Sequence, residues 1–172
     1  MEHNLDPPPP AGEVAGARQL RVTVVSVQHL PKSGWFSSMY PFCEVAFAGR
    51  KRFTASKKKK GGSVAFEQAL AFTVEDAAVA QEQLQLSVLN ARESCDCTTS
   101  ALAGTLMGMV AVPAETTTRI MQTEIGWEQQ VELDLEVDGK PMVGKDKQNT
   151  SVTIRITVLE APDADEEAPG GV

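Results

Sequence analysis

The segment SVTIRITVL, residues 151–159, carries the pattern that decides the fold. Its apolar residues fall at every second position from Val152 to Val158, and Thr and Arg residues stand between them. A period of two places one face of a β-strand in a core and the other in water, as in an antiparallel sheet. The segment is therefore predicted to be a half-buried strand.

The same period recurs along the chain outward from this segment. No long segment has a helical period, and short turns are expected only at 76–83 and around 115–124. Short strands with polar or glycine-containing connections are typical of two packed antiparallel sheets. The sequence thus predicts an all-β fold, an eight-stranded antiparallel Greek-key β-sandwich, with strands near 20–24, 42–47, 51–54, 66–74, 84–88, 106–112, 131–137 and 152–158.

Composition divides the chain into one domain and two ends. Residues 1–18 contain the run Pro7 to Pro10 and few apolar residues, so they are predicted to be a disordered, proline-rich lead-in. A proline run can dock on aromatic grooves of adaptor domains, although a plain linker is the simpler interpretation. Residues 160–172 are predicted to be a disordered acidic tail, which leaves 19–159 for the sandwich.

The net charge of −7 is unevenly distributed. Residues 1–17 and 160–172 hold eight of the 23 acidic residues and no Lys or Arg, so the middle is close to neutral. Seven of the 16 basic residues lie between Arg50 and Lys60. Three cysteines are too few for a disulfide framework, and neither a secretory signal nor a long apolar span is present. These features predict a cytoplasmic protein with reduced thiols.

The order of the apolar segments resembles that of C2 domains, the β-sandwich modules of protein kinase C and synaptotagmin. The resemblance covers residues 19–159. It implies a sandwich that opens on its Leu-x-Val-x-Val strand, in the second (type II) of two circularly permuted strand orders. The segments that carry it are LRVTVVSVQHLP (20–31), MYPFCEVAF (39–47), VAFEQALAFTV (64–74), LQLSVLNARES (84–94), ALAGTLMGMVAVP (101–113) and the closing SVTIRITVL.

The chain departs from the resemblance where many C2 domains bind calcium. That site uses about five aspartates from two loops, because a hard dication needs six to eight oxygen ligands. Tyr40 stands before Pro41 where the family has Asp, and the third-loop Asp-x-Asp pair falls on Asn90 and Arg92. We therefore expect a divergent member that binds no calcium, and no other metal or cofactor is expected.

Two segments are candidate contact sites. The basic segment can bind anionic lipid at about 1 kcal/mol per residue near the surface. It can equally be a solvated loop that protects an edge strand, and nucleic acid is disfavoured because no aromatic residues are interleaved. Trp35 and Phe36 form a candidate loop anchor, unless Trp35 folds back as a cap. The basic candidates are Arg50, Lys51, Arg52, Lys57, Lys58, Lys59 and Lys60.

No combination of residues suggests catalysis. His29 is the only histidine within 19–159, and no nucleophile motif or glycine-rich phosphate loop accompanies it. Cys95 and Cys97 lack the second pair that structural zinc needs. The near-neutral middle favours a non-catalytic, calcium-independent adaptor or scaffold that binds an unidentified protein partner. The alternative is calcium-independent membrane targeting through anionic phospholipid or phosphoinositide, and either function allows peripheral membrane or cytoskeletal association.

Overall fold

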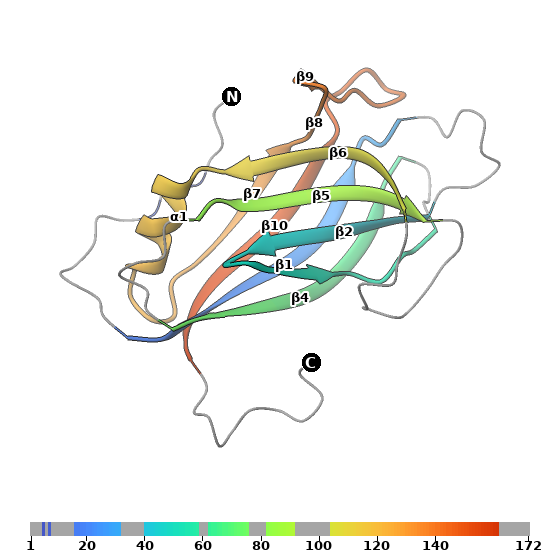
Figure 1. Cartoon of the computed structure of the whole chain (residues 1–172). Coiled ribbons are helices and arrows are strands. Elements are labelled where there is room, and N and C mark those ends of the chain that lie inside the picture. The colour runs from blue at the N-terminus through green and yellow to red at the C-terminus, as the bar shows by residue number, and fades with distance from the viewer. Residues whose placement is uncertain are drawn as a thin grey trace.

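The computed structural model describes residues 5, 7, 16–31, 40–58, 62–75, 82–91 and 104–161. These residues form two antiparallel sheets and one helix (Figure 1). No helix among them is long and apolar enough to cross a membrane. The elements are β1 (Arg18–Gln28), β2 (Tyr40–Phe47), β3 (Arg50–Phe53), β4 (Val64–Val74), β5 (Leu84–Ala91), β6 (Thr105–Val112), α1 (Ala114–Met121), β7 (Glu128–Asp134), β8 (Glu136–Val137), β9 (Lys140–Pro141) and β10 (Ser151–Glu160).

The strand order confirms the predicted Greek-key sandwich. One sheet has the order β4-β1-β10-β7 and the other the order β3-β2-β5-β6-β8-β9. The chain leaves β1 for the second sheet, forms β2 and β3 there, and returns to place β4 beside β1. The closing strand β10 lies between the opening strand and β7, which is the arrangement that the second strand order requires.

The alternating pattern found in the sequence fills the space between the sheets. Val22 of β1 is paired with Ile156 of β10, and both side chains are fully buried. On the opposite face Arg21 is exposed and Arg155 is half-buried, whereas Thr23, the partner of Arg155, is a buried polar residue. Each apolar side chain that leaves water in this way stabilises the fold by about 1.5–3 kcal/mol. The half-buried strands are therefore held together by their common apolar face.

The predicted strand at 131–137 is shared between the two sheets. β7 ends at Asp134 in the four-stranded sheet, and β8 begins at Glu136 and pairs with Met109 of β6 in the other sheet. Leu135 lies between them, fully buried, and its N–H donates to the carbonyl of Thr150 at 2.8 Å. The crossing adds two short strands, β8 and β9, to the eight that were expected.

Helix α1 occupies part of the stretch where a turn was expected. It begins after Pro113, whose ring suits the start of a helix, and the Thr117 hydroxyl donates to the Pro113 carbonyl at 2.9 Å. Ile120 and Met121 are buried in the core. The helix lies at the end of the sandwich where β6 finishes and β7 begins (Figure 1).

Candidate binding surface at the loop end

Several connections meet at the end of the sandwich opposite to α1, which we call the loop end (Figure 1). The stems of two of these loops are hydrogen-bonded to each other. The N–H of Lys57 donates to the Pro41 carbonyl at 3.1 Å, and the N–H of Leu30 donates to the Gly62 carbonyl at 2.8 Å. The connection from β1 to β2 therefore starts and finishes beside the connection from β3 to β4.

The basic residues on β3 do not all point to the same face of the sheet. Arg50 and Arg52 are paired with inward-facing residues of β2, so the pleat directs both arginines to one face of β3. Lys51 lies on the other face, 66% exposed, with its Nζ 3.6 Å from Glu44 Oε1. Because β3 is the outer strand of its sheet, these three residues surround an edge and do not form one flat patch.

The two described lysines that follow β3 lie at the loop end. Lys57 and Lys58 are exposed, and Lys57 Nζ reaches the Phe66 carbonyl at 3.4 Å. The other predicted contact residues, Lys59, Lys60, Trp35 and Phe36, lie outside the described residues. Trp35 and Phe36 nevertheless belong to the connection whose stems at Pro31 and Tyr40 frame the loop end.

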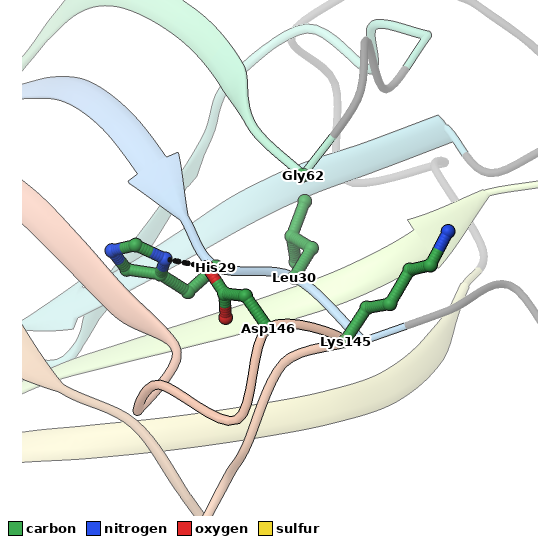
Figure 2. Close-up of a pocket in the computed structure, with 5 residues that line it drawn as sticks. All are labelled: His29, Leu30, Gly62, Lys145 and Asp146. Atoms are coloured by element: carbon green, nitrogen blue, oxygen red, sulfur yellow. Dashed lines mark hydrogen bonds and ion pairs between the residues drawn. The ribbon is translucent and has the colours of Figure 1, made fainter.

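A shallow pocket of about 310 Å³ opens at this end, lined by His29, Leu30, Gly62, Lys145 and Asp146 (Figure 2). His29 Nδ1 lies 2.6 Å from Asp146 Oδ2, and the Lys145 side chain extends on the other side of Leu30, away from His29 (Figure 2). The pocket thus combines a hydrogen-bonded His–Asp pair with a separate exposed lysine.

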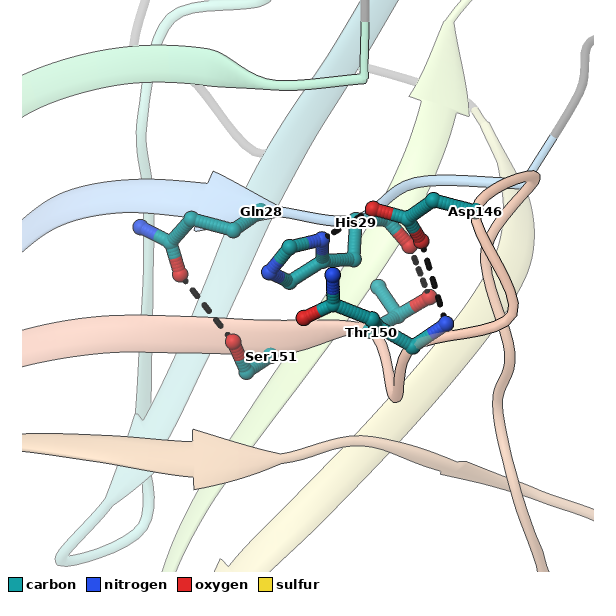
Figure 3. A network of polar contacts seen from close by, with 6 residues as sticks. Gln28, His29, Asp146, Thr150 and Ser151 are labelled. Atoms are coloured by element: carbon teal, nitrogen blue, oxygen red, sulfur yellow. Dashed lines mark hydrogen bonds and ion pairs between the residues drawn. The ribbon is translucent and has the colours of Figure 1, made fainter.

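Backbone contacts fix the loop that carries Lys145. His29 has a left-handed φ of 55°, and the Thr150 hydroxyl donates to its carbonyl at 2.5 Å (Figure 3). The side-chain amide oxygen of Gln28 accepts from the Ser151 hydroxyl at 3.1 Å. A β-carbon on Gly144 would lie 2.2 Å from the His29 carbonyl oxygen, so the loop backbone packs directly against the end of β1.

The Asp146 carboxylate is held in its charged form. The N–H of Gln148 donates to it at 3.1 Å, and this bond together with the His29 contact lowers the pKa of Asp146 below its usual value. The two lysines on either side of it, Lys145 and Lys147, are exposed. Sequence reasoning did not single out this loop. In the sequence, the loop is marked by the short charged run Lys145-Asp146-Lys147, which lies far along the chain from the lysines at 57–60.

The described residues do not fit a calcium ion at the family's usual place. The N–H of Tyr40 donates to Asn90 Oδ1 at 2.8 Å, so the two positions where ligands were sought are bonded to each other. No group of three His, Cys, Asp or Glu side chains gathers anywhere in the described part of the chain. Cys95 and Cys97, with the acidic residues Glu93 and Asp96, lie outside that part.

The described cysteine is not placed for reaction. Cys43 is fully buried in β2, and burial raises the pKa of its thiol to about 12. Its backbone N–H donates to the Thr54 hydroxyl oxygen at 2.9 Å. Since the thiolate is the reactive form, this thiol is a small core side chain at neutral pH.

Comparison with known proteins identifies the family. The C2 domain family model matches residues 18–130, and no curated protein matches the chain. Among solved structures, a C2 domain of plant extended synaptotagmin 1 shares 15% identity with a TM-score of 0.58, over 88% of this chain and 100% of that one. Human GIVD cytosolic phospholipase A2 shares 16% identity with a TM-score of 0.57, over 88% of this chain and 18% of that one. The chain belongs to the C2 domain family.

Proposed function

We propose that this chain is a non-catalytic, calcium-independent module that docks on anionic membrane surfaces with its loop end. The observation that carries the proposal is the pairing of loop stems, Lys57 with Pro41 and Leu30 with Gly62. It brings the lysine-rich connection and the connection that contains Trp35 and Phe36 to the same end of the sandwich. Basic residues attract anionic headgroups, and tryptophan prefers the membrane interface.

The exposed lysines of the loop end favour binding to an anionic surface, although the net charge of the whole chain is negative. Lys57, Lys58, Lys145 and Lys147 are exposed in the two loops, and Asp146 is the described acidic residue between them. Charges further away than about 8 Å are largely screened at physiological salt. The acidic ends of the chain, which favoured a protein partner in the sequence analysis, therefore weigh less than the residues within reach of the surface.

Calcium independence is supported by the bond between Tyr40 and Asn90. An amide oxygen that accepts a backbone N–H is less available to a cation, and neither residue supplies the negative charge that offsets the dehydration of calcium. The lysines would act instead as fixed positive charges. Docking of this kind weakens as salt rises and does not respond to chelation.

The test is co-sedimentation with neutral vesicles and with vesicles that contain phosphatidylserine or phosphoinositide, with calcium and with chelator. The loop-end variant combines Lys57→Glu and Lys58→Glu. The control combines Arg50→Glu and Lys51→Glu, which changes the net charge equally on β3. We expect anionic-selective binding that ignores calcium, is lost in the loop-end variant and is kept in the control. Binding that requires calcium, or equal loss in both variants, would refute the proposal.

A second candidate is a protein-interaction module, favoured by the exposed edge of β3. In an antiparallel ladder, hydrogen-bonded pairs alternate with pairs that are not hydrogen-bonded to each other. The Thr54 N–H donates to the Cys43 carbonyl, so this pair is hydrogen-bonded. By the register of the ladder, the backbone groups of Lys51 and Phe53 therefore point away from β2. An added strand would meet those groups between Arg50, Lys51 and Arg52. An extended acidic segment of a protein partner fits this charge.

This candidate has its own test. Lys51→Pro removes an outward N–H and leaves the bonds between β2 and β3 in place, whereas Lys51→Gln keeps the N–H and removes the charge. Binding of a short peptide of alternating Glu and Val, measured by calorimetry, is expected to be lost with Lys51→Pro and only weakened with Lys51→Gln. Equal affinity for both variants would exclude addition of a strand at this edge.

A further inference from the structure

Two residues of the proline-rich lead-in pack on the domain. Leu5 is only 7% exposed and belongs to the main hydrophobic core cluster, and Pro7 is also buried. The Pro7 carbonyl accepts a hydrogen bond from Arg119 Nη2 of α1 at 2.8 Å. We propose that the surface of α1 around Arg119, the α1 docking surface, is a peptide-binding site that the chain's own Leu5-x-Pro7 segment occupies.

The two contacts fit the chemistry of an extended Leu-x-Pro peptide. In an extended chain residues i and i+2 face the same side, so one face presents both the leucine side chain and the proline. Proline has no N–H, and its carbonyl is the one backbone group that needs a partner when it is buried. Arg119 supplies that partner with a charged donor, which makes a stronger bond than a neutral one.

The docking surface is held rigidly by the rest of the fold. Arg18 donates from its guanidinium to the carbonyls of Met121 and Thr123, which closes the last turn of α1. The Thr123 hydroxyl donates to the Ile120 carbonyl at 2.7 Å. Ile120 and Met121 are fully buried, so the helix cannot turn without opening the core. Arg119 is therefore presented from a fixed position to whatever segment lies beside it.

The position of the chain argues that the occupant is intramolecular. Arg18, at the start of β1, contacts the last turn of α1, and Pro7 contacts Arg119 in the same turn. The stretch that joins Pro7 to Arg18 thus starts and ends beside one turn of one helix. A short connection of this kind gives an effective concentration on the order of millimolar, so even a weak site is filled by its own segment.

Docking has a consequence for the proline run. Pro7 is the first of the four prolines, and it is buried in the docked arrangement. A protein that reads proline-rich segments can reach the start of the run only after the Leu5-x-Pro7 segment leaves α1. Because α1 lies opposite to the loop end, this site is independent of membrane docking.

The test uses the full chain with Leu5→Asp, which places a charge where the apolar anchor packs, and Leu5→Met as the matched control. A synthetic peptide of residues 1–11 is titrated into each isotopically labelled protein, and amide shifts of α1 are followed. We expect the peptide to bind the Leu5→Asp protein at least about tenfold more tightly than the wild type or the control, whose site is already filled. A peptide that carries Leu5→Asp should not bind.

Arg119 variants separate docking from general destabilisation. In the Leu5→Asp background, Arg119→Ala is expected to weaken peptide binding more than Arg119→Lys, which keeps a donor. Absence of α1 shifts, or equal peptide affinity for the wild type and Leu5→Asp, would overturn the proposal. Self-association of the wild type that Leu5→Asp abolishes would also overturn it, because the segment would then fill the site of a second copy.

Discussion

Gly144 carries the closest backbone approach at the loop end. Any β-carbon there would lie 2.2 Å from the His29 carbonyl oxygen, which is backbone and cannot rotate away. Gly144→Ala is therefore expected to destabilise the protein by about 1–3 kcal/mol, the usual cost of overpacking. Urea unfolding measures the loss.

Gly62 provides the matched control for this prediction. It lines the pocket beside His29, but a β-carbon on it would meet nothing within 4 Å. Gly62→Ala should stay within about 0.5 kcal/mol of the wild type. If both substitutions had the same effect, the contact between the Gly144 loop and His29 would not exist in solution.

The pKa of the Asp146 carboxyl reports the same contact. The Gln148 N–H and the His29 ring lower this pKa below its usual value, so the charged form is favoured in the folded state. The resulting stabilisation is present above the unfolded value and is lost as pH falls through the lowered folded value. Carboxyl titration by NMR should show a lowered pKa that rises in His29→Ala without reaching the ordinary value, because the larger contribution from Gln148 remains. A normal pKa in the wild type would contradict this account.

At the scale of elements, the β2–β3 hairpin carries local strain. Ala48 and Gly49 form its two-residue turn, with left-handed φ values of 54° and 73°. Alanine is disfavoured there, whereas Asn before Gly is the preferred pair for this turn. Ala48→Asn is therefore expected to stabilise the protein by roughly 0.5 kcal/mol, measured by urea unfolding.

The neighbouring residue gives the opposite expectation. Gly49→Ala has space for its β-carbon but must adopt a left-handed conformation, so it should destabilise the protein by about 1 kcal/mol. A gain in stability from Gly49→Ala, or a loss from Ala48→Asn, would mean that the turn is of another type.

The strands also show how much of the fold could be predicted from the sequence. Alternation located the strands because burial of one face imposes it, as in the pair Val22 and Ile156. It did not reveal the crossing at Leu135, because the alternation in the sequence continues unbroken from β7 into β8, although Val137 of β8 is 39% exposed. The pair Asp138-Gly139, with φ values of 52° and 76°, is a strong hairpin signal, and it marks the turn between β8 and β9.

The candidate sites were less predictable than the strands, for physical reasons. A run of basic residues does not show its faces until the register with β2 is known, and that register separates Lys51 from Arg50 and Arg52. Lys145 joins the loop end only through the topology of β10. Leu5 has no periodic partner in the sequence, so its burial depends on a tertiary contact that no local pattern encodes.

At the scale of the whole molecule, the two proposed surfaces lie at opposite ends of the sandwich. The loop end gathers Lys57, Lys58 and Lys145, whereas Arg119 of α1 donates to the Pro7 carbonyl at the other end (Figure 1). β3, with Arg50 at its start, runs along the side between them. A membrane at the loop end would thus leave Pro7, the first residue of the proline run, at the end away from the membrane.

This orientation can be measured directly. The labelled protein is added to anionic nanodiscs with and without a spin-labelled lipid, in chelator, and the broadening of each amide signal is recorded. We expect broadening at Lys57, Lys58 and residues 144–147, with little effect at the 48–49 turn or at Arg119. Broadening centred on the 48–49 turn or on α1, or none without added calcium, would contradict docking through the loop end.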